Sequence, residues 1–389
     1  MKIAFVWNAD RRDAHRRAVD LSFRFELYVE GMRRLGHEAL VVCREGGEEE
    51  APYPTATGSA QELESADFWR GLGLDVAIPI THHRRVAMLE ALAEAGVRTV
   101  AVADSDGRVG LHAHPRATVE RAWFYLDGLR PRLGALKYFA GRWLRGRRRD
   151  GEALEALASS RASDAVVFHS QPAIAAFRRL LTQHGCDESL APRLHAVPFA
   201  VHPELCQAPL PAEREDRVLA VGRWQDPQKD TPLLRSALEQ ALALRPETEV
   251  WIYGRGTEQA FGDLARRSGR VRLEGFRPPA ELHQQLARSR CMVFASRWET
   301  GPHAATEALA LGATVVGPPI PNLVGLTEGG RFGRVAADRS PAALAQALFE
   351  ELGAWDSGRR DGRAIAEHWR GQLHPTAICR QLLATVGRA

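Results

Sequence analysis

The sequence predicts an α/β protein with two Rossmann-like domains, each built on a doubly wound parallel sheet. Short apolar runs rich in β-branched residues alternate with longer segments of helical periodicity, which is typical of parallel sheets with crossover helices. These runs fall into two sets of six, and each set is enough for one complete sheet. A stretch rich in proline and charge, 203–216, separates the two sets and is the predicted linker.

The two sets of predicted strands differ only in their place along the chain. The first set is 2–7, 38–43, 75–80, 99–103, 165–169 and 194–198. The second set is 218–221, 249–253, 271–273, 291–295, 314–316 and 333–335. A helix is expected over 17–35, because Gly36 is a suitable left-handed residue just after its end. Ligands of such sheets bind at the carboxyl ends of strands, so functional side chains are expected in the loops that follow them.

Composition and charge exclude several classes of protein. The 389 residues, 45% hydrophobic and 26% charged, are typical of two or three globular domains. A net charge of +4 is too small for a general nucleic-acid binder. Five scattered cysteines without a C-x-x-C pair argue against disulfides and a zinc site, and favour a reducing cytoplasm. The apolar run at the N-terminus is too short for a signal peptide, and glycines and prolines break the longest uncharged stretch, 308–327, so no transmembrane segment is expected.

Two glutamates follow the predicted strand 291–295. Glu299 lies in a loop and Glu307 in the helix behind it, eight positions further on. The intervening Gly301 lets a ligand approach the backbone closely, and each carboxylate can accept a pair of vicinal hydroxyls. The spacing alone is weak evidence, since acidic pairs at any fixed offset arise by chance. A solvated loop charge at Glu299 and a glutamate placed by the helix dipole at Glu307 are the simpler interpretation of the pair by itself.

Two basic residues follow the strand 218–221, at the same edge of the second predicted sheet. Arg223 can hold a diphosphate through its planar fork, and Lys229 can hold it as a point charge. Taken singly, each is more simply an exposed residue on a turn. Their combination with the two glutamates is what favours a ligand site.

An ordered set of motifs in the second half resembles the donor-binding domain of retaining glycosyltransferases with the GT-B fold, in particular glycosyltransferase family 4. The first half of the chain fits the same family less tightly. The motifs are Gly222-Arg223 with Asp226-Pro227-x-Lys229, Tyr253-Gly254-Arg255-Gly256, Gly275-Phe276, and Ser296-x-x-Glu299-x-Gly301-Pro302 ahead of Glu307. The fold that this resemblance implies is two Rossmann-like domains facing across a cleft.

The activity implied by the resemblance is metal-independent, retaining transfer of a hexosyl group from a UDP- or GDP-sugar to an unidentified acceptor hydroxyl. No cofactor is expected besides this donor substrate. The implied catalytic residues are Arg223, Lys229 and Glu299, the two cations stabilising the charge that grows on the leaving diphosphate. In the implied donor site Arg223 and Lys229 bind the diphosphate, Glu299, Thr300, Gly301 and Pro302 bind the sugar, Glu307 binds the ribose, and the backbone at Phe276 and Arg277 meets the base.

The resemblance also divides the chain by role. Residues 1–203 would form the acceptor domain and 204–365 the donor domain, with 366–389 packing back on the first. The acceptor-side candidates are Arg11, His82, His83 and Asp106.

Each acceptor-side candidate has an alternative explanation. Loop positions explain His82 and His83 equally well, and neighbouring aspartates are the alternative partners of Arg11. Asp106 ends a D-x-D triplet, which binds metal in the other large glycosyltransferase fold, but it lies in the wrong half for the donor. We therefore interpret Asp106 as a residue lining the cleft.

Three other functions are weighed against glycosyl transfer. A glycosidase would use a carboxyl pair but gives no role to Arg223 and Lys229. A dinucleotide enzyme needs G-x-G-x-x-G directly after a strand, and the sequence has none. The first half departs from the family pattern, with no glycine in the loop 8–19, so a GT-B-like nucleotide-binding or scaffold protein without turnover is the main alternative.

The segment 130–149 holds eight basic residues and no acid, with apolar residues at helical spacing among them. Such a helix can lie on anionic lipid, or it can be a solvated helix with one face packed on its own domain. We expect a cytoplasmic protein without a nucleic-acid partner. Peripheral contact with the inner face of the membrane through 130–149, and an anionic or membrane-associated acceptor, stay open.

Overall fold

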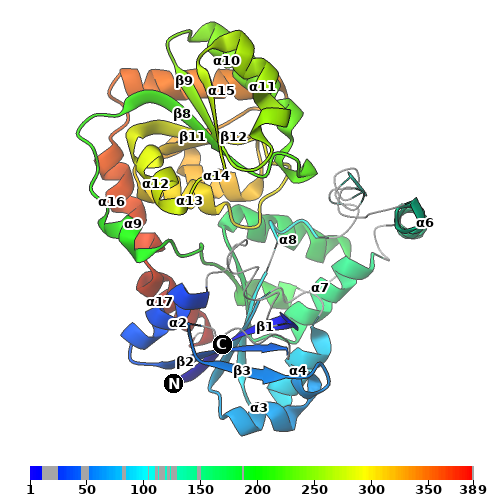
Figure 1. Ribbon diagram of the computed structural model, residues 1–389. Helices are drawn as coiled ribbons and strands as arrows, with labels where there is room; N and C mark the ends of the chain where they lie inside the picture. The colour runs from blue at the N-terminus through cyan, green and yellow to red at the C-terminus, as the bar shows by residue number, and fades with distance from the viewer. Residues whose placement is uncertain are drawn as a thin grey trace. The chain divides into compact units, whose positions relative to one another are not determined.

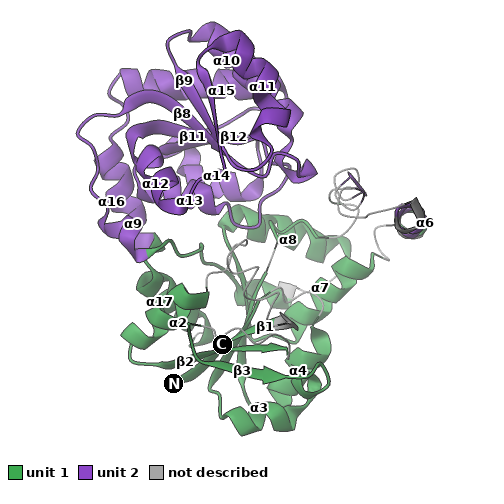
Figure 2. Cartoon of the chain, viewed as in Figure 1, with its two compact units in different colours: residues 1–114, 141–202, 373–389 green, residues 115–140, 203–372 purple. Residues whose placement is uncertain are grey.

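The protein consists of two compact units, drawn in Figures 1 and 2. Unit 1 comprises Met1–His114, Gly141–His202 and Leu373–Ala389, and unit 2 comprises Pro115–Ala140 and Pro203–Gln372. Within the described ranges, none of the helices combines the length and the apolar character needed to cross a membrane. The computed structural model describes residues 1–10, 25–44, 52–80, 85–103, 105–109, 113, 119–120, 123, 129–146, 150–185 and 188–387.

Unit 1 is built on a seven-stranded parallel sheet with the order β3-β2-β1-β4-β5-β6-β7. β1 lies inside the sheet, where Ile3 pairs in register with Ala39 on one side and Val76 on the other. Ile3 and its neighbours up to Val6 are fully buried, as expected for a strand covered on both faces. The strands are β1 (Lys2–Asp10), β2 (Glu38–Arg44), β3 (Thr55–Gly58), β4 (Val76–Pro79), β5 (Arg98–Val102), β6 (Ala165–Phe168) and β7 (Leu194–Ala196).

The helices of unit 1 begin and end at recognisable residues. Asp150 caps α7 by accepting a hydrogen bond from the Glu152 N–H, and Ser170 caps α8 in the same way from the Ala173 N–H. The elements are α2 (Phe25–Arg34), η1 (Glu62–Glu64), α3 (Ala66–Leu72), α4 (Val86–Glu94), α7 (Gly151–Arg161), α8 (Gln171–Gln183), η3 (Glu188–Arg193) and α17 (Pro375–Val386). Helix α6 (Leu129–Arg145) begins in the range of unit 2 and ends in that of unit 1.

Gly36 ends α2 as the sequence predicts. It has a φ of 82°, its N–H donates to the Arg33 carbonyl, and the His37 N–H donates to the Met32 carbonyl. This pair of hydrogen bonds is the Schellman motif, which requires a left-handed residue at the position of Gly36. The chain can therefore turn directly from α2 into β2.

Unit 2 is built on a six-stranded parallel sheet with the order β10-β9-β8-β11-β12-β13. The strands are β8 (Glu215–Val221), β9 (Glu249–Tyr253), β10 (Val271–Gly275), β11 (Ser289–Val293), β12 (Thr314–Gly317) and β13 (Gly333–Val335). The helices are α9 (Pro203–Gln207), η4 (Pro227–Lys229), α10 (Thr231–Leu244), α11 (Thr257–Ser268), α12 (Pro279–Arg288), α13 (His303–Ala310), α14 (Pro321–Thr327), η5 (Glu328–Gly330), α15 (Pro341–Asp356) and α16 (Gly362–Leu373).

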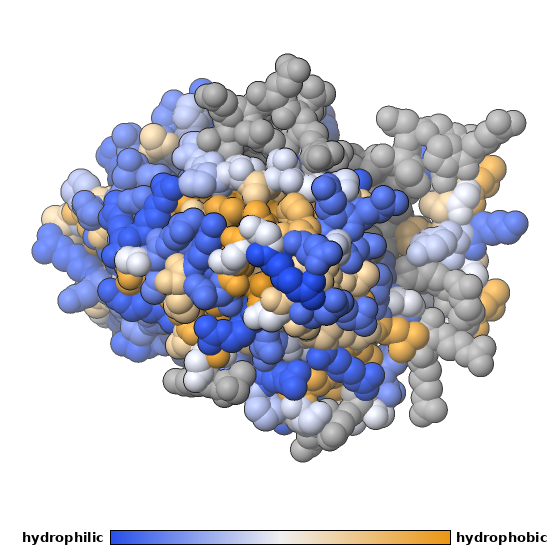
Figure 3. Space-filling view, turned by 90° about the horizontal axis from the view of Figure 1, so that it is seen from below, coloured by the Kyte–Doolittle hydropathy of each residue, from blue (hydrophilic) through white to orange (hydrophobic). Residues whose placement is uncertain are grey.

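All twelve strands predicted from the sequence are present, which confirms the two parallel sheets. The seventh strand of unit 1, β3, was not predicted, because its sequence Thr-Ala-Thr-Gly contains no apolar run. The predicted linker 203–216 is wrong in part, since it contains α9 and the first two residues of β8. On the face drawn in Figure 3, hydrophilic residues cover most of the described surface and hydrophobic ones show mainly in the middle.

The C-terminal helices belong to different units. Trp369 on α16 packs edge-on against Phe332 in unit 2, with 5.4 Å between the ring centroids. α17 joins the core of unit 1 beside α2, where a Cβ on Gly31 would lie only 2.7 Å from the Cys379 sulfur. Burial raises the pKa of the Cys379 thiol to about 12, so this cysteine is an uncharged core residue.

The loops after β8, β9 and β10 are bound to one another by backbone contacts. The Gly222 N–H donates to the Tyr253 carbonyl at 3.1 Å, and the Gly254 N–H donates to the Gly275 carbonyl at 2.7 Å. Gly254 has a φ of 115°, and a Cβ there would lie 1.8 Å from the Gly222 carbonyl oxygen. Only glycine fits this position, because any side chain would meet backbone that cannot move aside.

Gly254→Ala is therefore expected to destabilise unit 2 by at least about 1–3 kcal/mol from backbone strain, with the steric clash adding to it. Gly353→Ala is the matched control, since Gly353 lies inside α15 with no atom within 4 Å of the added Cβ. That control is expected to stabilise the protein by up to about 1 kcal/mol. Thermal unfolding followed by circular dichroism measures both. A Gly254→Ala protein that unfolds at the wild-type temperature would contradict the analysis.

Candidate functional site

An ion pair joins the loops after β8 and β11. The Lys229 Nζ lies 2.6 Å from Oε1 of Glu299, and the same Oε1 accepts a hydrogen bond of 2.6 Å from the Ser296 hydroxyl. The side chains of Lys229 and Glu299 are only 18% and 12% exposed. β8 and β11 are neighbours at the point where the strand order of the sheet reverses, which is where parallel α/β sheets bind ligands.

Backbone and amide hydrogen bonds hold these two loops together. The Gln228 carbonyl accepts from the Arg297 N–H at 2.8 Å, and the Gln228 side-chain amide donates to the Trp298 carbonyl at 2.9 Å. Asp226 opens η4 by accepting from the Gln228 N–H at 2.9 Å. The second Asp226 oxygen lies 3.3 Å from the guanidinium of Arg223, whose side chain is 47% exposed. Arg223 is thus held at the same edge of the sheet and still faces solvent.

Asn322 fixes the loop that carries Glu299. Its side-chain amide nitrogen donates to the carbonyls of Glu299 at 2.6 Å and Thr300 at 2.5 Å. Asn322 lies in the first turn of α14 and is 1% exposed. It therefore determines the path of the backbone from Glu299 through Thr300 towards Gly301 and Pro302.

Asp230 is the hub of a second polar network under the same loops. Its carboxylate lies 2.7 Å from the Arg339 guanidinium, which also donates to the Ser296 carbonyl at 2.8 Å. The Arg297 guanidinium lies 3.3 Å from the same Asp230 oxygen and also pairs with Glu120. Burial opposes the charge of Arg297, but the two carboxylates outweigh it and raise the pKa of the guanidinium. These ion pairs and hydrogen bonds hold the backbone of the loop after β11 in place, and they keep the Arg297 guanidinium positively charged.

Glu307 lies on α13 and is 6% exposed. Its Oε2 lies 3.3 Å from Nε2 of His283 on α12, although the two atoms are not aligned for a hydrogen bond. Pro302 precedes the first residue of α13, and its carbonyl accepts from the N–H groups of Ala305 and Thr306. Glu299 and Glu307 are therefore separated by one loop and one turn of helix.

Phe276 and Arg277 follow β10 at the same edge of the sheet. Phe276 is 68% exposed, an unusual place for a phenyl ring, and the Arg255 guanidinium lies 5.6 Å from its centroid. Arg277 pairs with Glu274 at 3.2 Å. Burial, assisted by the charge of Glu274, raises the pKa of the nearby Tyr253 phenol to about 12, so Tyr253 stays neutral near pH 7.

The acceptor-side candidates are less fully described. Arg11, His82 and His83 lie outside the described residues. Asp106 follows β5, is 2% exposed and is bound by both the backbone N–H and the guanidinium of Arg108. Its carboxylate is thus engaged within its own loop.

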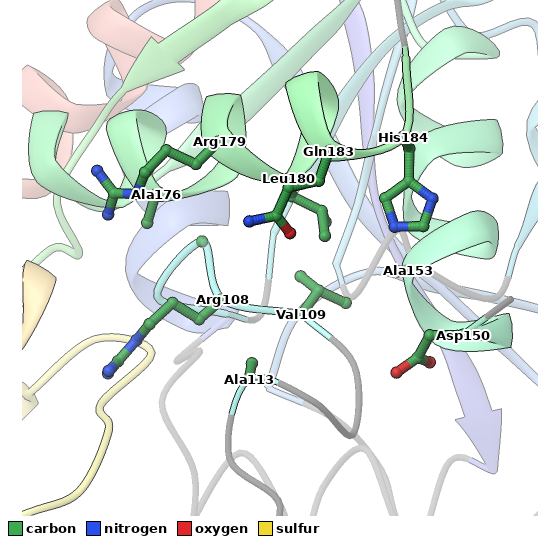
Figure 4. Close-up of a pocket in the computed structure, with 11 residues that line it drawn as sticks. Arg108, Val109, Ala113, Asp150, Ala153, Ala176, Arg179, Leu180, Gln183 and His184 are labelled. Atoms are coloured by element: carbon green, nitrogen blue, oxygen red, sulfur yellow. The ribbon is translucent and has the colours of Figure 1, made fainter. Parts of the chain in front are cut away.

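A pocket of about 180 Å³ lies beside this loop, within unit 1. Figure 4 shows Arg108 and Arg179 on one side of it and Asp150 and His184 on the other. Val109 and Leu180 form part of its apolar lining. The pocket has room for only a small ligand.

Comparison with known proteins gives the fold, and it gives a family match for part of the chain. Residues 215–352 match the sequence model of the family described as glycosyl transferases group 1. The crystal structure of HepE from Anabaena with UDP is similar at a TM-score of 0.67 and 15% identity, with 100% of both chains covered. The same protein with UDP and glucose gives a TM-score of 0.64 at 16% identity, again covering 100% of both chains. The chain has the GT-B fold.

Two further structures extend this GT-B likeness. Sucrose-phosphate synthase from Thermosynechococcus elongatus has a TM-score of 0.61 at 15% identity, covering 99% of this chain and 98% of its own. The apo form of the lipopolysaccharide outer core galactosyltransferase WaaB has a TM-score of 0.62 at 14% identity, covering 100% and 99%. No curated protein sequence matches the chain. The GT-B fold expected from the sequence is confirmed, and the glycosyl transferases group 1 domain lies in unit 2.

The structure brings together most of the donor-side residues singled out in the sequence, at one edge of the sheet of unit 2. Three other residues were not predicted from the sequence: Asn322, which holds the Glu299 loop, Asp230, which holds two arginines, and His283, which faces Glu307. Their partners are distant in sequence, so no local pattern identifies them. Among the residues that the structure describes, there is no group of three or more His, Cys, Asp or Glu suited to a metal ion.

Replacing Asn322 by alanine should loosen the Glu299 loop. The change removes two hydrogen bonds to buried backbone, which is expected to cost about 1–3 kcal/mol. The Tm should fall by about 2–4 °C for each kcal/mol. Val324→Ala serves as the control, because Val324 lies on the same helix and is 40% exposed. Equal Tm values for the two variants would show that Asn322 does not hold the loop.

Proposed function

We propose that the protein is a retaining, metal-independent hexosyltransferase of glycosyltransferase family 4, with a UDP- or GDP-sugar as donor. The observation that carries the proposal is the Lys229–Glu299 pair at the reversal point of the unit 2 sheet. This pair lies within the segment that matches glycosyl transferases group 1. Support also comes from HepE, a structural neighbour solved with UDP and with UDP and glucose.

The diphosphate of the donor would bind Arg223 and Lys229. An ammonium group has three N–H donors, so Lys229 can keep one on Glu299 and offer the others to phosphate oxygens. Arg223 is half-exposed and can turn its planar fork from Asp226 to the diphosphate. As the bond from sugar to phosphate breaks, negative charge grows on the leaving diphosphate, and these cations stabilise it without a metal ion.

The sugar and the nucleoside would bind on either side of the diphosphate. Ser296 and Lys229 both bind Oε1 of Glu299, so Oε2 is the oxygen that would accept hydroxyls of the sugar. The loop Thr300, Gly301 and Pro302 would line the same place. Glu307 would accept the ribose hydroxyls, and the backbone at Phe276 and Arg277 would meet the base.

Unit 1 would supply the acceptor side, and Arg11, His82, His83 and Asp106 stay predictions for that role. A cytoplasmic place of action is part of the proposal, since nucleotide-sugars suit that compartment, as do the thiols of Cys206, Cys291 and Cys379 in the described part of the chain, which form no disulfide. The acceptor would be a hydroxyl of an anionic or membrane-associated molecule, reached at the inner face of a membrane.

Arg223→Ala and Glu307→Ala should each weaken the binding of the cognate nucleoside diphosphate by about tenfold or more, equivalent to about 1.4 kcal/mol. A thermal-shift panel of UDP, GDP and ADP, followed by calorimetry, measures this. Arg266→Ala is the matched control, because Arg266 is a 67% exposed arginine on α11. Stabilisation by one nucleoside diphosphate, lost in the two variants and kept in the control, is expected. Equal affinity in wild type and Arg223→Ala would remove the phosphate site from the proposal.

Glu299→Ala should spare the affinity for the free nucleotide and reduce transfer by about 10²-fold or more, because the part of the donor that its carboxylate would contact is the sugar and not the nucleotide. The measurement is release of nucleoside diphosphate from a panel of sugar donors, with and without candidate acceptors. Nucleotide binding without any donor consumption by the wild type would replace transfer with the nucleotide-binding or scaffold function.

A further inference from the structure

Helix α6 (Leu129–Arg145) is strongly basic and amphipathic. Its seventeen residues include five bases and no acid: Arg130, Arg132, Lys137, Arg142 and Arg145. At 100° per residue, Leu133, Leu136, Trp143 and Leu144 fall within an arc about 100° wide, and Tyr138 falls on the opposite side. The helix thus has one apolar face bordered by positive charge.

The apolar face of α6 is exposed to solvent. Leu133, Leu136, Trp143 and Leu144 are 53%, 40%, 51% and 85% exposed. Five of the twelve exposed large hydrophobic residues in the described part of the chain belong to α6, which is labelled in Figure 1. An amphipathic helix of a globular protein normally turns this face to its own core. A cluster of exposed apolar residues on one element marks an interaction surface instead.

We propose that the apolar face of α6 docks on an anionic lipid bilayer. Arg132 and Lys137, which border the face, would bind the lipid headgroups, while the leucines and Trp143 enter the boundary with the acyl chains. Arg132 also lies over the ring of Trp123, 5.1 Å from its centroid, which adds a second exposed tryptophan beside the helix. Tryptophan and arginine are both common at membrane interfaces.

Charge complementarity argues against a second copy of the chain as the occupant. In a symmetric contact through the apolar faces of two α6 helices, Arg132 and Lys137, which border the face, would meet the same two residues of the other copy, with no acid on either helix. Like charges brought together in this way oppose association. An anionic bilayer offers negative headgroups to the basic residues and an apolar interior to the apolar face.

This proposal rests on the proposed function, because it names the surface on which the enzyme would act. Membrane binding can nevertheless be measured without measuring glycosyl transfer. The full chain is mixed with phosphatidylcholine vesicles, or with vesicles that also contain about 30% phosphatidylglycerol, and floated on a density gradient. We expect flotation with the anionic vesicles, about tenfold less with phosphatidylcholine alone, and a decline as salt is raised.

Leu133→Ser/Leu144→Ser should reduce flotation about tenfold, because both leucines lie on the apolar face. Tyr138→Ser, which removes a 56% exposed ring from the opposite side of the same helix, should float within about twofold of wild type. Lys137→Glu should weaken flotation on anionic vesicles. Thermal unfolding and nucleotide-induced stabilisation of each variant show that the fold and the donor site are intact, which separates failure here from failure of the proposed function.

Four results would overturn the proposal. Wild type that stays unbound on anionic vesicles is the first, and a double serine variant that floats like wild type is the second. Equal loss of flotation in Tyr138→Ser would show that the apolar face is not the docking surface. A dimer of the unbound wild type in ultracentrifugation, absent from the double serine variant, would assign the face to a second copy.

Discussion

The opposite charges of Lys229 and Glu299 form an ion pair that is largely buried at the edge of the unit 2 sheet. Many of the surrounding hydrogen bonds hold the two loops that carry this pair. A buried charge without a partner is costly, so both side chains must be positioned by their loops. The Ser296 hydroxyl donates to the Glu299 carboxylate, and the Gln228 amide joins the two loops through the Trp298 carbonyl. Asn322 and Arg339 donate to backbone carbonyls of the loop after β11. Glu299 is thereby presented by a rigid loop and not by a solvated one.

The topology of the sheet decides where this pair can form. β9 and β10 extend the sheet from one side of β8, and β11, β12 and β13 extend it from the other. The loops after β8 and β11 meet at this reversal point, where the Gln228–Arg297 and Lys229–Glu299 contacts join them. Glycine at position 254 lets the loop after β9 pack on the loop after β8. Any side chain at this position would push the two loops apart.

Periodicity and turn chemistry were sufficient to predict most strands and the end of α2 at Gly36, because a strand buried on both faces leaves a continuous apolar run. β3 escaped prediction, since its Thr-Ala-Thr-Gly sequence carries no such run. The sequence placed Lys229 and Glu299 at one edge, but their direct contact and the roles of Asn322 and His283 depend on residues 20 to 70 positions apart. Such contacts are products of tertiary packing, which no local window contains. The donor-site roles themselves stay predictions, as do those of Arg11, His82 and His83.

The central claim is that Lys229 neutralises Glu299 and also receives the diphosphate. Calorimetric titration of UDP and GDP into wild type, Lys229→Met and Lys229→Met/Glu299→Gln tests it most directly. We predict that Lys229→Met binds about tenfold more weakly or worse, because it removes a cation from the diphosphate and leaves the negative charge of Glu299 unneutralised beside it. The double variant should recover part of that loss, because the carboxylate is then gone. Unchanged affinity in Lys229→Met would contradict the account.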